Sequence, residues 1–149
     1  MLQMRSSRYS IRAAYIVGVA GLMTSFGASA QSARPQEAWG YLVRQDFSDC
    51  QNQNVNANNP DMIGGTIGIV KNNDGSMSAK VGITAKPNTR YNFYLKCVRQ
   101  LGTIQTYDEG EGVQIFEIPA GQAGQIITFD MYPDGAPAGN KFQSTQVKF

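Results

Sequence analysis

Histidine is absent from this chain of 149 residues, which also has only two cysteines and one tryptophan. Without histidine the chain cannot build a Ser-His-Asp triad or a histidine-ligated zinc, copper or iron centre, and it lacks the commonest general base. Two cysteines without C-x-x-C spacing are also too few for a thiolate metal site. We therefore expect no cofactor, no metal and no enzymatic activity.

Long hydrophobic runs are absent as well. A membrane-spanning helix needs about 20 apolar residues, and the longest run here, Ala13 to Met23, is roughly half of that. Three arginines within residues 5–12 precede the run, and the small residues Ala28-Ser29-Ala30 follow it. This order predicts a signal peptide over residues 1–30, with no stable membrane insertion after its cleavage. The alternative is that the run is retained as a membrane anchor.

The remaining segment, residues 31–149, is long enough for one hydrophobic core but not for two. Once the three leader arginines are removed, 10 basic residues stand against 11 acidic residues, a net charge of −1. The basic character of the full chain therefore belongs to its leader, and nothing indicates nucleic acid as a partner. We expect one domain over residues 31–149, located in the periplasm or secreted from the cell.

The two cysteines, Cys50 and Cys97, are predicted to form an intramolecular disulfide, because exported proteins fold in an oxidising compartment. Closing a loop of this length would stabilise the fold by about 4 kcal/mol in the chain-entropy model. Two free thiols, or a bridge between two chains, are the alternatives.

Short alternating segments separated by Gly, Pro or Asn predict an all-β fold without a persuasive helix. One buried and one solvated face per strand indicate antiparallel pairing, so we expect a single antiparallel β-sandwich of about seven to eight short strands. An Asp74-Gly75 turn links two of them as a hairpin. The expected strands are residues 38–43, 63–70, 76–86, 91–98, 102–107, 113–118, 125–132 and 142–149.

Alternation also assigns the faces of these strands. The expected core includes Val81 and Ile83 on the strand after the hairpin turn. On the following strand the expected core row is Tyr91, Phe93, Leu95 and Cys97, and the opposite row is Asn92, Tyr94, Lys96 and Val98.

Two segments carry a weak family resemblance. Residues 87–95, Pro-Asn-Thr-Arg-Tyr-Asn-Phe-Tyr-Leu, resemble the P-x-T-x-Y-x-[VF]-x-[VL] strand of fibronectin type III and related immunoglobulin-like domains. Residues 106–112, Thr-Tyr-Asp-Glu-Gly-Glu-Gly, resemble a turn of bacterial secreted β-sandwich modules. The resemblance implies an immunoglobulin-like fold and an accessory or adhesive role, and it carries over no functional residues. The disulfide and a long Asn-rich loop depart from the standard fibronectin module.

Two features are candidates for partner contact. The polar loop from Gln51 to Asn59 lacks any strand or helix pattern and is long for a compact domain. Its amides could bind a sugar or a protein, or the loop could simply be solvated: Gln51, Asn52, Asn54, Asn56, Asn58 and Asn59. Aromatic side chains could form a platform for sugar rings, but most are expected in the core. The candidates are Trp39, Tyr41, Tyr94, Tyr107 and Tyr132, and Tyr94 is the exception because it is expected to face away from the core row of its strand.

Acidic residues give no clear catalytic or metal site. The turn at residues 108–112 could bind calcium, although it lacks the spacing of a known calcium loop. Glu117 and Asp130 could form a carboxylate pair for glycoside hydrolysis, although alternation does not place them on one face. We expect an exported, non-enzymatic binding or envelope-accessory module that contacts a protein or a glycan. The alternative is a small secreted hydrolase or hydrolase inhibitor.

Overall fold

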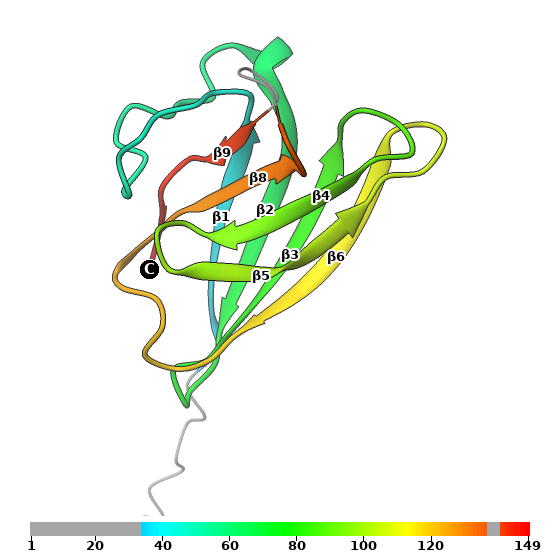
Figure 1. Cartoon of the computed structure of the whole chain (residues 1–149). Coiled ribbons are helices and arrows are strands. Elements are labelled where there is room, and N and C mark those ends of the chain that lie inside the picture. Colours follow the sequence, from blue (N-terminus) through cyan, green and yellow to red (C-terminus); the bar gives the residue numbers. More distant parts are fainter. Residues whose placement is uncertain (1–33, 137–140) are drawn as a thin grey trace, which may run out of the picture. The chain divides into compact units, whose positions relative to one another are not determined.

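Figure 1 shows a computed structural model, which describes residues 34–136 and 141–149. The predicted signal peptide lies outside the described residues. Within them the chain forms ten β-strands and one 3-10 turn, so the expected all-β class is confirmed. The elements are β1 (Gln36–Val43), η1 (Pro60–Met62), β2 (Ile63–Lys71), β3 (Met77–Thr84), β4 (Arg90–Leu95), β5 (Arg99–Gln105), β6 (Glu111–Ile118), β7 (Ile126–Ile127), β8 (Phe129–Pro133), β9 (Phe142–Ser144) and β10 (Val147–Lys148).

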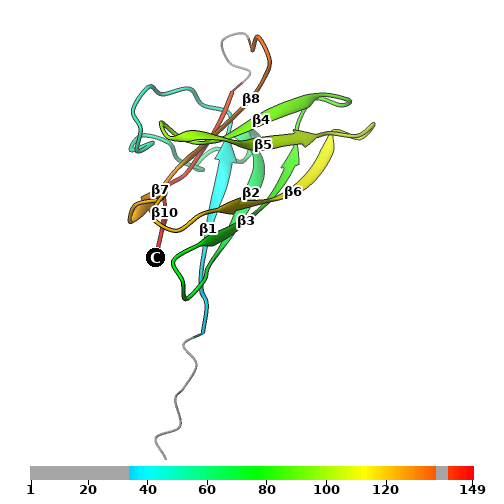
Figure 2. The ribbon, with the colours of Figure 1, turned by 60° about the horizontal axis from the view of Figure 1, so that its bottom comes forward.

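Eight of the strands form one antiparallel sheet in the order β5-β4-β8-β9-β1-β2-β3-β6, and β7 pairs with β10 separately. The sheet folds over itself, so that β4, β5 and β8 lie across from β1, β2, β3 and β6 (Figure 1 and Figure 2). β9 connects the two layers because it pairs with β8 on one side and with β1 on the other. Antiparallel pairing is confirmed, but the expected sandwich of two separate sheets is replaced by two halves of one nearly closed sheet.

The curling brings the two edge strands of the main sheet toward each other. β5 and β6 are neighbours in sequence, and the Tyr107 N–H donates to the Glu111 carbonyl at 2.9 Å in the turn between them. Further along, a Cβ atom added to Gly112 would lie 2.7 Å from the Gln105 carbonyl oxygen. The backbones of the two edges therefore approach closely near this turn.

Two predicted strands are interrupted. Residues 125–132 divide into β7 and β8, and residues 142–149 divide into β9 and β10. Side-chain hydroxyls near both breaks bind backbone N–H groups: Ser144 Oγ accepts from Phe129 N at 2.9 Å, and Thr145 Oγ1 accepts from Tyr41 N at 3.0 Å. At these positions a side-chain oxygen, rather than a backbone carbonyl of a paired strand, accepts from the backbone N–H.

The β2–β3 hairpin follows the sequence prediction closely. The turn before β3 places Gly75 at φ +84°, a left-handed conformation that glycine adopts without strain. The alternating side chains of β3 then enter the core as expected: Met77, Ala79, Val81 and Ile83 are all buried.

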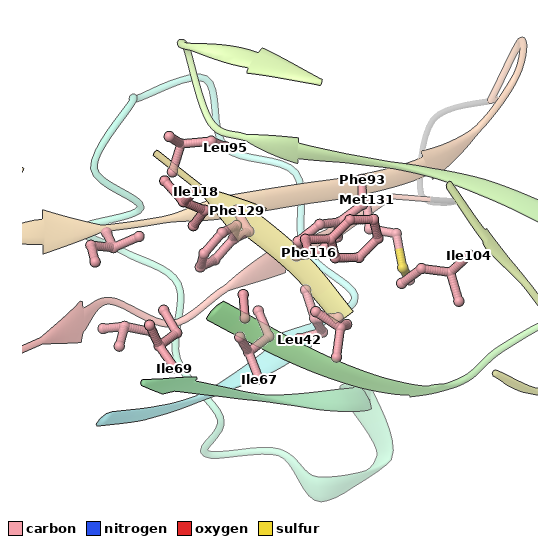
Figure 3. Packing of buried hydrophobic residues seen from close by; sticks show 14 of the residues in the cluster. Leu42, Ile67, Ile69, Phe93, Leu95, Ile104, Phe116, Ile118, Phe129 and Met131 are labelled. Carbon is pink, nitrogen blue, oxygen red and sulfur yellow. The ribbon is translucent and has the colours of Figure 1, made fainter. Parts of the chain in front are cut away.

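The core lies between the two layers (Figure 3). Phe93 of β4 stacks between Phe116 of β6 and Phe129 of β8, with ring centroids 4.7 Å and 5.1 Å apart. The same strand contributes Tyr91 and Leu95, both buried as predicted. Because Phe93 touches aromatic rings from both layers, its contacts hold the folded-over sheet together.

Replacing Phe93 with alanine is expected to lower the free energy of unfolding by about 3–5 kcal/mol, because it leaves a cavity between two rings. Tyr94→Ala is the matched control: it truncates the next residue of β4, whose side chain points out of the core. Urea denaturation of both variants measures the difference. A larger loss for Tyr94→Ala would show that the face assignment of β4 is inverted.

Candidate functional site

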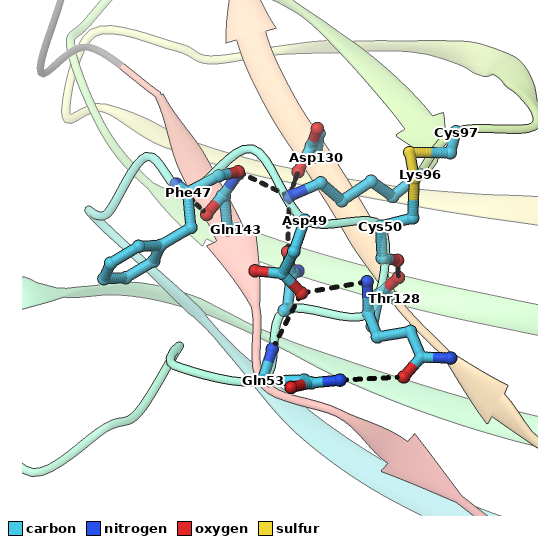
Figure 4. Close-up of a disulfide and its surroundings, with 11 residues drawn as sticks. Phe47, Asp49, Cys50, Gln53, Lys96, Cys97, Thr128, Asp130 and Gln143 are labelled. Carbon is cyan, nitrogen blue, oxygen red and sulfur yellow. Dashed lines mark hydrogen bonds and ion pairs between the residues drawn. A yellow bond between two sulfur atoms is a disulfide. The ribbon is translucent and has the colours of Figure 1, made fainter.

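The Cys50–Cys97 disulfide is present, as predicted (Figure 4). The expectation that Cys97 faces the core is wrong, because β4 ends at Leu95 and Cys97 lies in the following turn. Its φ of +58° breaks the strand alternation, and both cysteines are exposed. The disulfide therefore ties the Asn-rich loop to the β4–β5 turn at the surface of the domain.

The loop is anchored to the sheet rather than loosely solvated. Asn52, with φ +48°, is fully buried, and its amide nitrogen donates to the Ser144 carbonyl at 2.9 Å. The Thr128 hydroxyl donates to the Cys50 carbonyl at 2.8 Å, and Val55 is also buried. Asn52 therefore serves the fold and is not available to a partner. The other predicted contact amides remain exposed: Gln51, Asn54, Asn56, Asn58 and Asn59.

Lys96 is the centre of this anchoring, and it was expected to be on the solvent side. Only 4% of its side chain is exposed. Its ammonium group donates to the Phe47 carbonyl at 2.8 Å and to Asn52 Oδ1 at 2.5 Å, and it lies 3.5 Å from Asp130 Oδ1 (Figure 4). Alternation placed Lys96 on the outer face correctly, but it could not show that the loop covers that face.

Gln143 supports the same arrangement from β9. Its side chain holds both backbone groups of Phe47, accepting from the N–H at 2.7 Å and donating to the carbonyl at 2.8 Å. Gln143 also stabilises the carboxylate of Asp130, but burial has the larger effect and raises the pKa of Asp130 above its usual value. The positive charge of Lys96 opposes this rise.

An open depression of about 590 Å³ lies over this cluster and is lined by Asp46, Phe47, Ser48, Lys96, Cys97, Asp130, Lys141 and Gln143. Next to it, a second hollow of about 280 Å³ includes Tyr94 and Tyr132, whose rings stack at 4.8 Å. Desolvation and the neighbouring Tyr94 raise the pKa of Tyr132 to about 12, so its phenol stays protonated. Tyr94 therefore faces outward as predicted, but its neighbour partly covers it.

The most exposed aromatic residue of β1 was expected in the core. Trp39, the only tryptophan of the chain, is 69% exposed, and Tyr41 on the same face is 48% exposed. The small residues Ala38 and Gly40 face inward instead, together with Leu42. The sequence contains one signal for this arrangement: the alternate residues of the strand, Ala38, Gly40 and Leu42, also form a consistent inner row.

Trp39 lies over the backbone of Gly68 on β2. A Cβ atom added to Gly68 would lie 2.6 Å from the Trp39 ring, so any larger residue would displace the indole. Only glycine allows this close approach. The ring thus contacts the sheet backbone at Gly68 while most of its surface remains in solvent.

Strand register sets the composition of this outer face. One row across β1, β2, β3 and β6 is Trp39, Gly68, Lys80 and Ile115, and the next is Tyr41, Thr66, Gly82 and Val113. Val113 and Ile115 are 62% and 54% exposed. We call these two rows the aromatic face. Its apolar side chains lie at both margins, with glycine, threonine and one lysine between them.

Two hollows mark the aromatic face, and Thr66 lines both. The first, about 260 Å³, is lined by Trp39, Gly40, Tyr41, Thr66 and Thr145. The second, about 400 Å³, extends over β2, β3 and β6, where Thr66, Thr84 and Glu111 contribute its polar side chains. An apolar surface with a few polar groups is the usual lining of a ligand site.

The acidic residues weighed as catalytic or metal ligands do not converge. Ser78 donates to both oxygens of Glu117 on the outer side of β6, whereas Asp130 faces Lys96 on the other layer. In residues 34–136 and 141–149, no group of three or more Cys, Asp or Glu side chains is placed to hold a metal ion. No helix in the described part of the chain is long and apolar enough to cross a membrane.

No protein-family model matches this chain, and no curated protein matches it either.

Replacing Lys96 with methionine is expected to lower the free energy of unfolding by about 3–5 kcal/mol, because it leaves the partly buried Asp130 carboxylate unpaired and Asn52 Oδ1 without its donor. Lys80→Met is the control, since Lys80 is exposed on β3, and its cost should stay within about 0.5 kcal/mol. Thermal and urea unfolding measure both. Equal effects would contradict the anchoring role of Lys96.

The raised pKa of Asp130 sets a pH dependence of the unfolding free energy. The folded protein binds this proton more tightly than the unfolded chain, so the contribution of Asp130 to stability increases as the pH falls from 7 through its folded pKa. Wild-type protein should therefore gain stability relative to Asp130→Asn on acidification. Urea unfolding at pH 7 and pH 4.5 measures the difference. A loss of stability of the wild type relative to the variant on acidification would show that the pKa of Asp130 is lowered rather than raised.

Proposed function

We propose that this protein is an exported, non-enzymatic binding module that acts through the aromatic face. The observation that carries the proposal is the placement of Trp39. Burial of a large apolar side chain is favourable, yet this one contacts Gly68 and remains 69% exposed. Large apolar side chains exposed together on one face, as Trp39 and Tyr41 are, are typical of binding sites.

Export accounts for the disulfide. A covalent bond between two exposed cysteines persists in an oxidising compartment and is rare in the cytosol. Together with the leader sequence, it supports a periplasmic or secreted location. In that setting the curled sheet is a rigid support, and an immunoglobulin-like relationship, resting on the strand at residues 87–95, fits an accessory or adhesive role.

The exposed loop amides and Tyr94 form a second candidate surface. They adjoin the hollow of Tyr94 and Tyr132 and the depression beside Lys96. This surface presents charges of both signs, and its best-ordered amide, Asn52, is already used inside the fold. We therefore rank it below the aromatic face as the place of partner contact.

A small hydrolase is the other functional class, and the separation of Glu117 from Asp130 on opposite layers argues against a carboxylate pair built from them. A hydrolase inhibitor would instead act as a binding module, so it falls within the proposal.

Co-sedimentation of the purified exported domain with the insoluble envelope of the producing cell tests the proposal. Trp39→Ala should raise the apparent dissociation constant about tenfold, the loss of one stacking contact of roughly 1.4 kcal/mol, without changing stability. Tyr94→Ala and the double variant Asn54→Ser/Asn58→Ser, which changes only exposed side chains of the loop, are matched controls on the second surface, and both should bind normally. Loss of binding in those controls alone would move the contact to the loop, and turnover of a glycoside substrate would contradict the non-enzymatic role.

A further inference from the structure

We infer that the ligand of the aromatic face is an uncharged glycan that runs across the strands from Trp39 toward Glu111. This inference rests on the proposed function and specifies its ligand. It rests on the chemistry of the two hollows. One offers aromatic rings for the C–H face of a sugar, and the other offers hydrogen-bonding groups for the hydroxyls at its edge.

The first hollow offers stacking surfaces. Trp39 and Tyr41 are two residues apart on β1, so their side chains leave the same face of the sheet. The flat C–H surface of a pyranose packs against the face of an aromatic ring, whose electron density attracts the polarised hydrogens. The indole contacts the backbone at Gly68 and is 69% exposed, so most of its ring surface is accessible to a sugar.

The second hollow offers hydrogen bonds. The Glu111 carboxylate is exposed at the start of β6, opposite Thr84 in the strand register, and both residues line this hollow. A carboxylate accepts from two adjacent hydroxyl groups, which is the pattern that a sugar ring presents at its edge. The hydroxyl of Thr66, which lines both hollows, can serve a sugar in either position.

The length of the face suits a short run of sugars. The row from Tyr41 to Val113 crosses four strands, and three strand spacings span about 14 Å. A disaccharide over Trp39 would leave the Glu111 hollow empty, whereas a longer oligosaccharide would reach both. Gly82 adds no side chain between Thr66 and Val113, so a chain without large side groups can lie close to the backbone there.

The charges near the face favour a neutral ligand. Lys80 is the only basic residue in the two rows, whereas the outer side of β6 carries two exposed carboxylates, Glu111 and Glu117. A sulfated or uronic acid polymer would meet these carboxylates without a cluster of basic residues to offset the repulsion. A protein partner is less suited, since its apolar side chains would find apolar contacts only at the two margins of the face.

The test uses the full exported domain and neutral oligosaccharides of two to six sugars from the cello-, xylo-, manno- and chito- series. Binding is followed by calorimetry and by the emission of Trp39, which reports on the platform directly because it is the only tryptophan. At least one hexasaccharide should shift this emission to shorter wavelength. Its disaccharide should bind about tenfold more weakly, because it fills one hollow only.

Two variants and one control measure how much each hollow contributes to oligosaccharide binding. Trp39→Ala should weaken hexasaccharide binding about tenfold or more, and Glu111→Gln several-fold, because an amide accepts fewer hydroxyl hydrogens than a carboxylate. Tyr107→Ala is the matched control: it removes an aromatic ring that is also 69% exposed but lines neither hollow. Calorimetry on the Trp39→Ala protein replaces the lost emission signal.

Failure of the glycan inference and failure of the proposed function give different results. Absence of binding to all four series, or binding to polygalacturonate alone, would overturn the inference. In the co-sedimentation assay, a Trp39-dependent signal that disappears after protease treatment of the envelope would overturn the inference and leave the binding function standing. A signal that survives protease and is lost after periodate oxidation of vicinal diols would support both. A signal that does not depend on Trp39 would overturn both.

Discussion

The stacked rings of Phe116, Phe93 and Phe129 hold together a sheet that has to bury one face against itself. An isolated antiparallel sheet leaves one apolar face in water, and it is stable only when that face finds a cover. Here the cover is the other half of the same sheet, and Phe93 on β4 bridges to β6 across the core and to its own neighbour β8. The corner at β9, paired on both sides, makes this folding possible without breaking the sheet.

Folding one sheet over leaves two outer faces, and the chain treats them differently. Over β4, β8 and β9 it lays the Asn-rich loop, secured by the disulfide and by the ammonium of Lys96. No segment of the described residues covers β1, β2, β3 and β6, and the single tryptophan lies on that side of the sheet. One face is thus closed by the protein's own chain, whereas the other presents apolar rings to solvent. The contrast is the reason why the aromatic face, rather than the loop, carries the functional proposal.

The sequence predicts local structure here better than it predicts exposure. The alternation of β3 and the Asp74-Gly75 turn depend on neighbouring residues only, and both are found as predicted. The inner and outer rows of β4 are also correct up to Leu95. Alternation fails at Cys97, because a left-handed residue ends the pattern, and this conformation has no local signal in a non-glycine residue.

Burial on the outer faces depends on segments far apart in the chain, and for this reason the site was the least predictable part. Lys96 is buried because a loop more than forty residues earlier covers it, an arrangement that no periodicity encodes. Trp39 is the opposite case. Its size suggested a place in the core, but the phase of β1, which is fixed by pairing with β2, decides which way the side chain points. A size-based expectation therefore failed where a register-based one would have succeeded.

The topology has a consequence for self-assembly. β6 contains Val113 to Ile118, a segment rich in β-branched and aromatic residues, and such segments promote cross-strand aggregation when their backbone groups are free. The unpaired side of β6 is turned toward β5, the other unpaired edge, so each edge obstructs strand addition to the other. Closure of the sheet thus protects the chain against amyloid-like growth. This protection lasts only while β5 and β6 stay close to each other.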